Sequence, residues 1–407
     1  MAKIRPFEAY MPAQGMEKDM AALPYDVYNR KEAKAVVEGK PYTFLRIDRA
    51  ETNFSDDVDT YDECVYEKAD SLLQEWIATG YYVKQDTPKY YLYREIMNGR
   101  AQTGIVAVAS VADYENNIIK KHENTLAAKE ADRIRHIEKT RMQTGPIFLA
   151  FRDDDTINSI IEKVCKMTPY YDFKSDDGIE HIVWLVEDAD DIRAITDAFE
   201  GMNAIYIADG HHRCASACKV GAKLHTDGIE KESDFFLSVL FPESQLKILD
   251  YNRVVRDLNG YSADEFLEEL EQYFDICHSD TSVSPTCKGE FGMYLEDNWY
   301  VLKLKTEWLN DDPVDGLDVS LLQKYVLGGM LDIDDPKNNN RIDFVGGIRG
   351  LSELERRCHE DCKVAFSMYP TDIKELFAVA DAGRLMPPKS TWFEPKLRSG
   401  LFLHDIR

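Results

Sequence analysis

The stretch AIYIADGHHRCASACKV, residues 204–220, holds the turn from which the rest of the sequence is interpreted. Its first residues, Ala204 to Ala208, are mostly apolar and suit a buried strand, and Asp209-Gly210 is a turn pair. A run that suits a helix begins at His211. Because a strand that leads directly into a helix is typical of α/β folds, this stretch decides the fold class.

The turn itself predicts an anion-binding site. A helix that begins at His211 leaves backbone N–H groups and the positive end of its dipole facing the turn. Gly210 allows close approach of a ligand, and Arg213 offers planar donors to phosphate oxygens. His211 and His212 can donate hydrogen bonds or move a proton. We interpret the turn as a cradle for nucleotide phosphates; the alternative is that Asp209 only caps the helix and the other side chains have structural partners.

Elements on both sides of the turn predict a mixed α/β sheet. Asn98-Gly99 predicts a tight hairpin, and residues 296–298 predict a second one. Further strands are expected at 182–186 and 235–241, and helices at 61–79, 126–142 and 190–199. We divide the chain into an α/β core that binds nucleotide and substrate, residues 1–245, and a C-terminal α+β lobe closely packed on it, residues 246–407.

Composition restricts the classes of partner. The 407 residues carry 49 Lys and Arg against 74 Asp and Glu, a net charge of −25, which disfavours nucleic acid and anionic membrane surfaces. No apolar run suggests a signal peptide or a membrane span, so we expect a cytoplasmic protein with reduced cysteines. The sequence does not fix the oligomeric state, and a homodimer is among the options.

A second polar cluster lies before and within the predicted helix 126–142. A carboxylate and a hydroxyl at the start of this helix could meet a substrate or a metal, and a row of side chains along one helix face could converge on an anion. A solvated charged face is the alternative interpretation of this row. The residues at the start are His122, Glu123 and Thr125, and the row is Lys129, Arg133, His136 and Thr140.

Two other polar residues follow prolines. Asp26 comes directly after Pro24-Tyr25, where a turn would project its carboxylate or use it as a helix cap. Lys389 follows two prolines near the end of the chain, in a segment that serves either a site or a structural latch. Cys214 and Cys218, four residues apart beside His211, allow a zinc site, but core residues on a helix face are the favoured interpretation.

Six segments resemble, in the same order, the domain-of-unknown-function 1015 family. They are RPFEAYMP, LPYDVYN, HENTLAAKEADRIRH, GPIFLAF, YIADGHHR and MPPKSTWFEPKLRSGL, between residues 5 and 401. That family is similar to free serine kinases and, more distantly, to the ParB and sulfiredoxin nucleotide fold. The resemblance implies such a core with added N-terminal and C-terminal α+β elements.

The resemblance also implies a reaction, the phosphorylation of free L-serine to O-phospho-L-serine with ATP, or ADP, and Mg²⁺. Asp26 or Glu123 would be the general base, with His211 as a further catalytic group, and Glu123 and Asp209 would hold Mg²⁺. His122 and Thr125 would contact the substrate. The predicted nucleotide-binding residues are Asp209, Gly210, His211, His212, Arg213, Lys129, Arg133, His136, Thr140 and Lys389.

Two other function classes remain open at this point. A ParB-like regulator would use the same turn to bind a nucleotide without turning it over. A zinc-dependent hydrolase would use the histidines and cysteines as metal ligands.

Overall fold

The computed structural model describes all residues, 1–407, as two compact units. The first unit contains residues 1–246 and 395–407, and the second contains residues 247–394. The last thirteen residues were expected in the C-terminal lobe, but the chain returns to the first unit at Pro395. This return matters for the site, because it brings polar side chains of the tail next to residues more than a hundred positions away.

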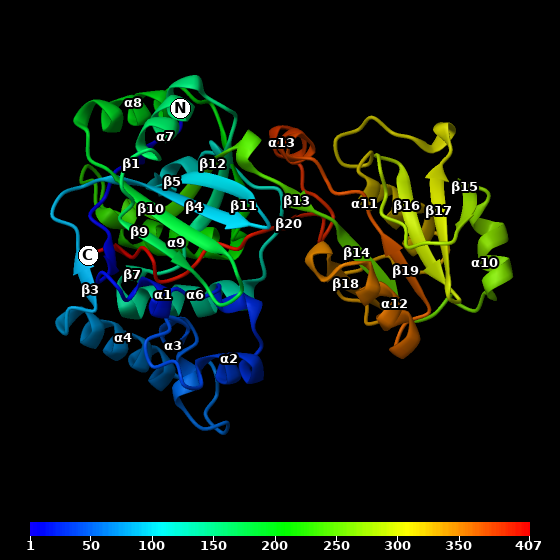
Figure 1. The fold of residues 1–407 in the computed structure, drawn as a ribbon, viewed down its shortest axis with the longest axis horizontal. Helices are drawn as coiled ribbons and strands as arrows, with labels where there is room; N and C mark the ends of the chain where they lie inside the picture. The colour runs from blue at the N-terminus through cyan, green and yellow to red at the C-terminus, as the bar shows by residue number, and fades with distance from the viewer. The chain divides into compact units, whose positions relative to one another are not determined.

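A mixed nine-stranded sheet forms the centre of the first unit (Figure 1). Its pairs are antiparallel except for β12 with β8 and β11 with β6, which confirms the predicted mixed α/β class. The strands, in sheet order, are β6 (Ile119–Lys120), β11 (Ile205–Asp209), β8 (Ile147–Phe151), β12 (Phe235–Pro242), β5 (Arg100–Ser110), β4 (Tyr90–Met97), β10 (Glu180–Val186) and β9 (Tyr171–Lys174), with β1 (Ile4–Arg5) on β5.

The sequence explains the central strands directly. All eight residues of β12 are buried, as the uninterrupted run FFLSVLFP requires of a strand covered on both faces. The β4–β5 hairpin turns at Asn98 and Gly99, whose φ angles of +52° and +77° fit the tight turn that this pair favours. Both elements match the sequence-based prediction.

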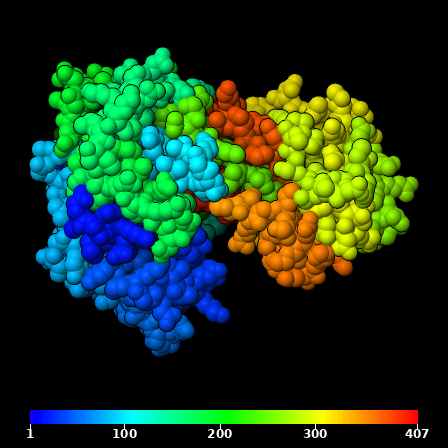
Figure 2. Space-filling model, in the orientation of Figure 1, coloured from blue at the N-terminus to red at the C-terminus, as the bar shows by residue number.

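Two hydrophobic cores stabilise the first unit. One lies on the sheet and includes residues of α6 to α9, and the other joins the N-terminal helices, whose residues form a continuous blue region of the surface in Figure 2. The helices are α1 (Glu17–Met20), α2 (Arg30–Val37), α3 (Leu45–Asp48), α4 (Glu63–Ala78), α5 (Val111–Glu115), α6 (Ala127–Thr140), α7 (Asp155–Val164), α8 (Ala189–Glu200) and α9 (His211–Leu224).

Two small strand pairs fasten the ends of this unit. The pair β2 (Tyr10–Pro12) and β3 (Tyr82–Lys84) closes the N-terminal helical region. The pair β7 (Met142–Gln143) and β21 (His404–Asp405) fixes the C-terminal tail beside the end of α6. The tail therefore belongs to the fold of the first unit.

The second unit has its own six-stranded antiparallel sheet. Its strands, in sheet order, are β15 (Phe274–Ser279), β17 (Asn298–Leu304), β16 (Glu290–Leu295), β19 (Val364–Ser367), β14 (Tyr251–Val255) and β18 (Ile342–Gly346). The strands β13 (Ile248–Leu249) and β20 (Trp392–Phe393) pair separately, and the helices are α10 (Ala263–Leu270), α11 (Asp318–Leu322), α12 (Leu351–Glu360) and α13 (Ile373–Asp381). None of the helices in the chain has the length and apolar character needed to cross a bilayer.

Candidate functional site

The turn between β11 and α9 has the geometry of an anion cradle. Gly210 has a φ of +87°, a conformation that side chains other than glycine rarely adopt, and α9 begins at the next residue. No side chain caps α9, although the helix is fourteen residues long. Its first N–H groups and the positive end of its dipole are therefore available to a negatively charged ligand.

Arg213 lies against this turn. A Cβ at Gly210 would lie 3.1 Å from both Nε and Nη2 of Arg213, so only glycine allows the guanidinium this close to the backbone. Nη1 of Arg213 donates to the carbonyl of Pro146 at 2.6 Å, which fixes the side chain. Its Nε is buried and has no hydrogen-bond partner. An immobilised guanidinium with an unused donor is suited to a phosphate or carboxylate.

Asp209 is paired with a lysine from the C-terminal tail. Lys396 Nζ lies 3.0 Å from one carboxylate oxygen of Asp209, and the N–H of Gly210 donates to the other at 2.8 Å. Burial alone would raise the pKa of Asp209, but Lys396 and Arg213 outweigh it and hold that pKa well below its usual value. Asp209 is thus an ionised group that orders the turn.

His122 and His211 form a buried pair beside the turn. Their rings meet edge to face with centroids 4.5 Å apart, and Nδ1 of His122 and Nε2 of His211 have no hydrogen-bond partner. Burial lowers the pKa of His122 to about 4 and that of His211 well below its usual value, so both are neutral at neutral pH. Nδ1 of His211 lies 3.8 Å from the carboxylate of the half-buried Glu123. Together, His122, His211 and Glu123 could accept a proton or bind a polar ligand.

His212 and Thr125 connect the two polar segments. Nε2 of His212 accepts a hydrogen bond from the N–H of Leu126 at 2.9 Å, at the start of α6. The hydroxyl of Thr125 hydrogen-bonds to Glu130, and this bond, with the one from Lys219, helps to lower the pKa of Glu130 despite its desolvation. His212 and Thr125 were both predicted to contact ligands. Both have structural partners, which hold residues 122–126 against α9.

On the polar face of α6, unlike at the turn, the polar side chains bond to neighbouring protein groups. Arg133 donates through Nε to Asp132 at 2.9 Å and through Nη2 to the backbone carbonyl of Asp48 at 3.3 Å. His136 bonds through Nε2 to the carbonyl of Ile47 at 3.2 Å, and burial followed by the charge of Arg133 lowers its pKa. The hydroxyl of Thr140 donates to the carbonyl of His136 at 2.7 Å, so it too is used within the fold.

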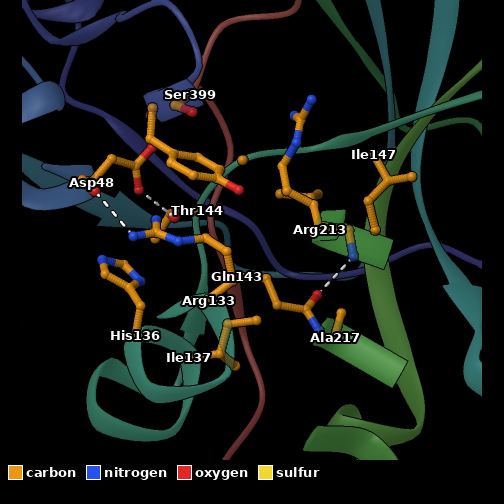
Figure 3. Close-up of a pocket in the computed structure, with 13 residues that line it drawn as sticks. Asp48, Arg133, His136, Ile137, Gln143, Thr144, Ile147, Arg213, Ala217 and Ser399 are labelled. Atoms are coloured by element: carbon orange, nitrogen blue, oxygen red, sulfur yellow. Dashed lines mark hydrogen bonds between the residues drawn. The ribbon is translucent and has the colours of Figure 1, made fainter. Parts of the chain in front are cut away.

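Two adjacent cavities are lined by this face. Each is lined by Tyr25, Asp48, Arg133 and His136. The first, of about 30 Å³, also includes Arg213, and Figure 3 shows Asp48, Arg133 and His136 on one side of it and Arg213 on the other. The second, of about 300 Å³, is also lined by the exposed Asp26 and Lys129. Arg133 and His136 thus line both cavities. Asp26 and Lys129 line only the second, Arg213 lines only the first, and Thr140 lines neither.

Three residues of this site were not selected from the sequence. Tyr25 lies in the 3₁₀ turn Tyr25–Val27, Asp48 ends α3, and Lys396 lies in the tail. Asp48 follows Leu45 and Ile47 on a short buried helix, and an acidic residue in such an apolar segment is the only local signal. Lys396 had no local signal, since only the returning tail brings it to Asp209.

Lys389 belongs to the second unit, where its φ is +59° and its ammonium lies 5.6 Å from the centroid of the Tyr251 ring. Its predicted contact with nucleotide stays a prediction. In the first unit, Asp26 keeps its place among the candidate bases because it lines the second cavity.

The zinc hypothesis lacks a set of ligands. Cys214 and Cys218 are buried in the hydrophobic core on the sheet. Across residues 1–407, no group of three or more His, Cys, Asp or Glu side chains is placed to hold a metal ion. The cysteines therefore act as small core residues, as the favoured interpretation of their spacing predicted.

Magnesium binding by Asp209 also does not fit the geometry. Both carboxylate oxygens of Asp209 already accept hydrogen bonds, one of them from the cation Lys396. A divalent cation would have to displace that ammonium. Glu123 remains a predicted ligand, and one or two carboxylates together with nucleotide phosphates suffice for Mg²⁺ in many proteins.

Comparison with known proteins found no match among curated proteins. Among solved structures, free serine kinase in complex with AMP is similar at 14% identity, with 71% of this chain and 86% of that chain covered and a TM-score of 0.36. A mutant of free serine kinase in complex with ADP has 12% identity, coverages of 72% and 88%, and a TM-score of 0.37. Truncated SbnI from Staphylococcus aureus has 13% identity, coverages of 71% and 82%, and a TM-score of 0.35.

At these scores, residue roles in those proteins do not transfer to this chain. The family comparison is more extensive, because a family model matches residues 4–320 of the 407 and includes the turn, α6 and Asp26. Its description is "Protein of unknown function (DUF1015)". As predicted, the chain belongs to this family, although the last of the six resembling segments, residues 386–401, lies beyond the match.

Proposed function

We propose that this protein is a kinase that transfers a phosphoryl group from a nucleotide, ATP or ADP, to the hydroxyl of free L-serine. The observation that supports the nucleotide site best is the uncapped start of α9 beside Arg213, whose buried Nε has no partner. Helix N-termini with a nearby arginine bind phosphates through backbone N–H groups and charge-assisted hydrogen bonds. The choice of serine as acceptor comes from the resemblance to free serine kinases.

The groups at and beside the turn have separate roles in this proposal. The N–H groups of α9 and Arg213 bind the phosphates and stabilise the negative charge of the transferring group. The neutral histidines His122 and His211 supply ring nitrogens without partners as donors or acceptors to the same group. Lys396 keeps Asp209 ionised and fixed, so that the backbone of the turn is preorganised.

A serine hydroxyl has a high pKa, so a carboxylate must accept its proton during transfer. Glu123 is one candidate base, next to His211, and Asp26 is the other, at the mouth of the second cavity. Kinases that use a nucleotide as donor commonly bind Mg²⁺ together with its phosphates, and the ion would neutralise the charge of the phosphates when bound. Glu123 is the protein carboxylate we propose for its shell.

The test is an incubation of the purified full chain with Mg²⁺, L-serine and either ATP or ADP, with O-phosphoserine measured by mass spectrometry. Arg213→Ala should reduce product by about two orders of magnitude or more, the usual effect of removing a group that stabilises transferring charge. Lys223→Ala is the matched control and should behave like wild type, because Lys223 lies on α9 like Arg213 but is exposed and pairs with Glu138 of α6. Equal product from Arg213→Ala would contradict the role of the turn.

The second candidate is a regulator that binds nucleotide without turnover. The pairing of Asp209 with Lys396 favours it, because the carboxylate nearest the cradle is already neutralised by a protein cation. This candidate predicts that nucleotide stabilises the protein against heat and stays chemically unchanged in the presence of L-serine and Mg²⁺. Phosphoserine formation by wild type eliminates it.

A further inference from the structure

A third cavity lies in the first unit, and the proposed function does not use it. Its volume is about 380 Å³, and it is lined by residues of and near α1 and α2, by the hairpin between β9 and β10, and by Arg398 of the C-terminal tail. It shares Tyr28 with the second cavity and no residue with the first. A ligand in the third cavity would therefore occupy space that is separate from the turn at residues 209–213.

Arg398 is the most deeply buried charged group of this lining. Its side chain is 4% exposed, and its Nη2 forms an ion pair with Asp177. The same nitrogen lies 3.4 Å from the hydroxyl of Ser175, and Nε donates to Nε2 of His181 at 3.3 Å. Nη1 takes part in none of these bonds. A guanidinium that is held through two of its nitrogens can use the third as a donor to a ligand in the cavity.

A chain of buried hydrogen bonds holds Arg398 from behind. Burial, followed by the charge of Arg398, lowers the pKa of His181 to about 3, so this histidine is neutral. Because arginine can only donate, Nε2 of His181 is an acceptor and the ring proton is on Nδ1, 2.8 Å from the hydroxyl of Tyr93. That hydroxyl donates to Glu95 at 3.2 Å, and His181, Tyr93 and Glu95 are fully buried. The network fixes the cation of Arg398 in one position.

The other charged side chains of the lining are exposed. Asp177 is paired with Arg398, and Asp176 is paired with Lys40 at 2.9 Å. Asp19 also lines the cavity and is exposed. Water and salt screen such exposed charges, whereas a buried charge is screened much less. The charge that a ligand meets at the inner end of the cavity is therefore the positive charge of Arg398, which disfavours a cationic ligand.

The remaining walls combine a hydroxyl group with apolar surface. Burial raises the pKa of Tyr28, with Arg398 partly opposing it, so the hydroxyl is protonated and can donate. Leu23, Val36 and Tyr42 are only half-buried, although they line a cavity. A ligand with an apolar body would remove more of their surface from water, which is favourable.

We propose that this cavity binds a small organic monocarboxylate, with its carboxylate on Arg398 and Tyr28 and its apolar body against Leu23 and Val36. A guanidinium is well matched to a planar carboxylate. A dianionic phosphate fits poorly, because Asp177 lies directly beside the guanidinium and would repel the additional charge. The site goes beyond the proposed function, since its ligand is neither the nucleotide nor the acceptor of that reaction.

Calorimetry on the purified full chain tests the site with four probes. Three share one aromatic body, namely phenylacetate, the neutral phenylacetamide and the cation phenethylamine, and the fourth is inorganic phosphate. Wild type should bind phenylacetate at least about tenfold more tightly than each of the others, because only phenylacetate combines an apolar body with a charge-assisted hydrogen bond to Arg398. No measurable binding of phenylacetate, or equal or tighter binding of another probe, overturns the inference.

Two variants assign the contacts. Arg398→Gln keeps a donor without the charge and should reduce the affinity for phenylacetate to that for phenylacetamide. Tyr28→Phe should weaken phenylacetate binding about fivefold through loss of the hydroxyl. Tyr42→Phe is its matched control and should bind like wild type, because Tyr42 lines the same cavity but its hydroxyl bonds to Tyr81.

A preference for phenylacetate that survives in Arg398→Gln, or equal effects of Tyr28→Phe and Tyr42→Phe, contradicts the proposed contacts. The wild-type series decides even where Arg398→Gln does not fold. None of these outcomes depends on phosphoserine formation, so the site and the kinase function can fail separately.

Discussion

The turn at residues 209–213 and the polar face of α6 contain similar residue types, arginine and histidine, and yet they differ in what those residues contact. At the turn, Arg213, His122 and His211 each keep a buried nitrogen without a hydrogen-bond partner. On α6, His136 and Thr140 bond to backbone carbonyls and Arg133 to Asp132.

Buried polar atoms in proteins are almost always satisfied by the protein, by water or by a ligand, so the unsatisfied nitrogens at the turn can accept such a partner. By this criterion the turn is prepared for a ligand, while much of the α6 face supports the fold. Arg133 belongs to both groups, since it holds Asp132 and also lines the cavities. The comparison gives four further predictions.

The largest difference should appear in turnover. Arg213→Ala should lower phosphoserine formation by about a hundredfold or more, whereas Lys129→Ala should lower it by less than about tenfold, because Lys129 is exposed on α6 and acts through screened charge. The measurement is initial rate at saturating nucleotide for both variants. Equal losses would show that α6 contributes as strongly as the turn.

Acid should weaken the turn through its buried histidines. The folded pKa of His122 is about 4, lowered chiefly by burial and partly opposed by Asp209, while an unfolded histidine titrates near 6.5. Stability from neutral His122 is full above the unfolded value and falls as pH drops toward the folded one. We expect His122→Phe to remove about 2 kcal/mol of the loss in unfolding free energy between pH 7 and pH 5.

Urea unfolding at the two pH values measures this difference. His225→Phe is the control, because the exposed His225 pairs with Asp234 and its pKa is raised. An unchanged acid response in His122→Phe would mean that His122 is not held neutral in the fold.

The ion pair between Lys396 and Asp209 should have a smaller effect. Lys396→Met removes the main partner of a carboxylate whose pKa is lowered despite burial, at an expected cost of about 1–2 kcal/mol in unfolding free energy at pH 7. A lowered folded pKa contributes stability above the unfolded value and loses it as pH falls through the folded one, so the difference from wild type should persist down to about pH 3 and shrink only at lower pH.

Lys163→Met, which breaks the more exposed pair with Asp191, is the control for Lys396→Met and should change stability by less than about 0.5 kcal/mol. Equal effects of the two variants would show that the tail pair is an ordinary surface pair.

The smallest effect is expected at Thr140. Thr140→Val keeps the shape of the side chain and removes the hydroxyl that bonds to the carbonyl of His136, which should cost about 1 kcal/mol. Nucleotide affinity, measured by calorimetry, should stay within about twofold of wild type. A large loss of affinity at unchanged stability would move Thr140 from the support of α6 into the binding site.

Much of the local structure was predictable because local rules dominate it. The strand β11 begins and ends within one residue of its predicted position, and α9 begins at the predicted residue, His211. The Asn98-Gly99 hairpin and the fully buried β12 follow from turn chemistry and an unbroken apolar run. The mixed sheet class followed from the order of these elements, although the sheet order itself did not.

The candidate site was predictable only in part. Residue type and position identified Gly210 and Arg213, because a strand-to-helix turn has local chemical meaning. Residue type and position did not distinguish His122, which has an unsatisfied nitrogen, from Thr140, whose hydroxyl is bonded to the backbone. That difference depends on which carbonyls lie nearby, and distant segments supply many of them.

The sequence by itself therefore determined many of the elements, the mixed α/β class and the family, and it predicted an anion cradle at residues 209–213. Only the tertiary structure decided that the tail returns to place Lys396 on Asp209, that His122 meets His211 edge to face, and that Asp48 lines the cavities with Tyr25 and Arg133. The physical reason is that secondary structure and turn geometry arise from neighbours in the chain, whereas burial, pKa and charge balance arise from neighbours in space.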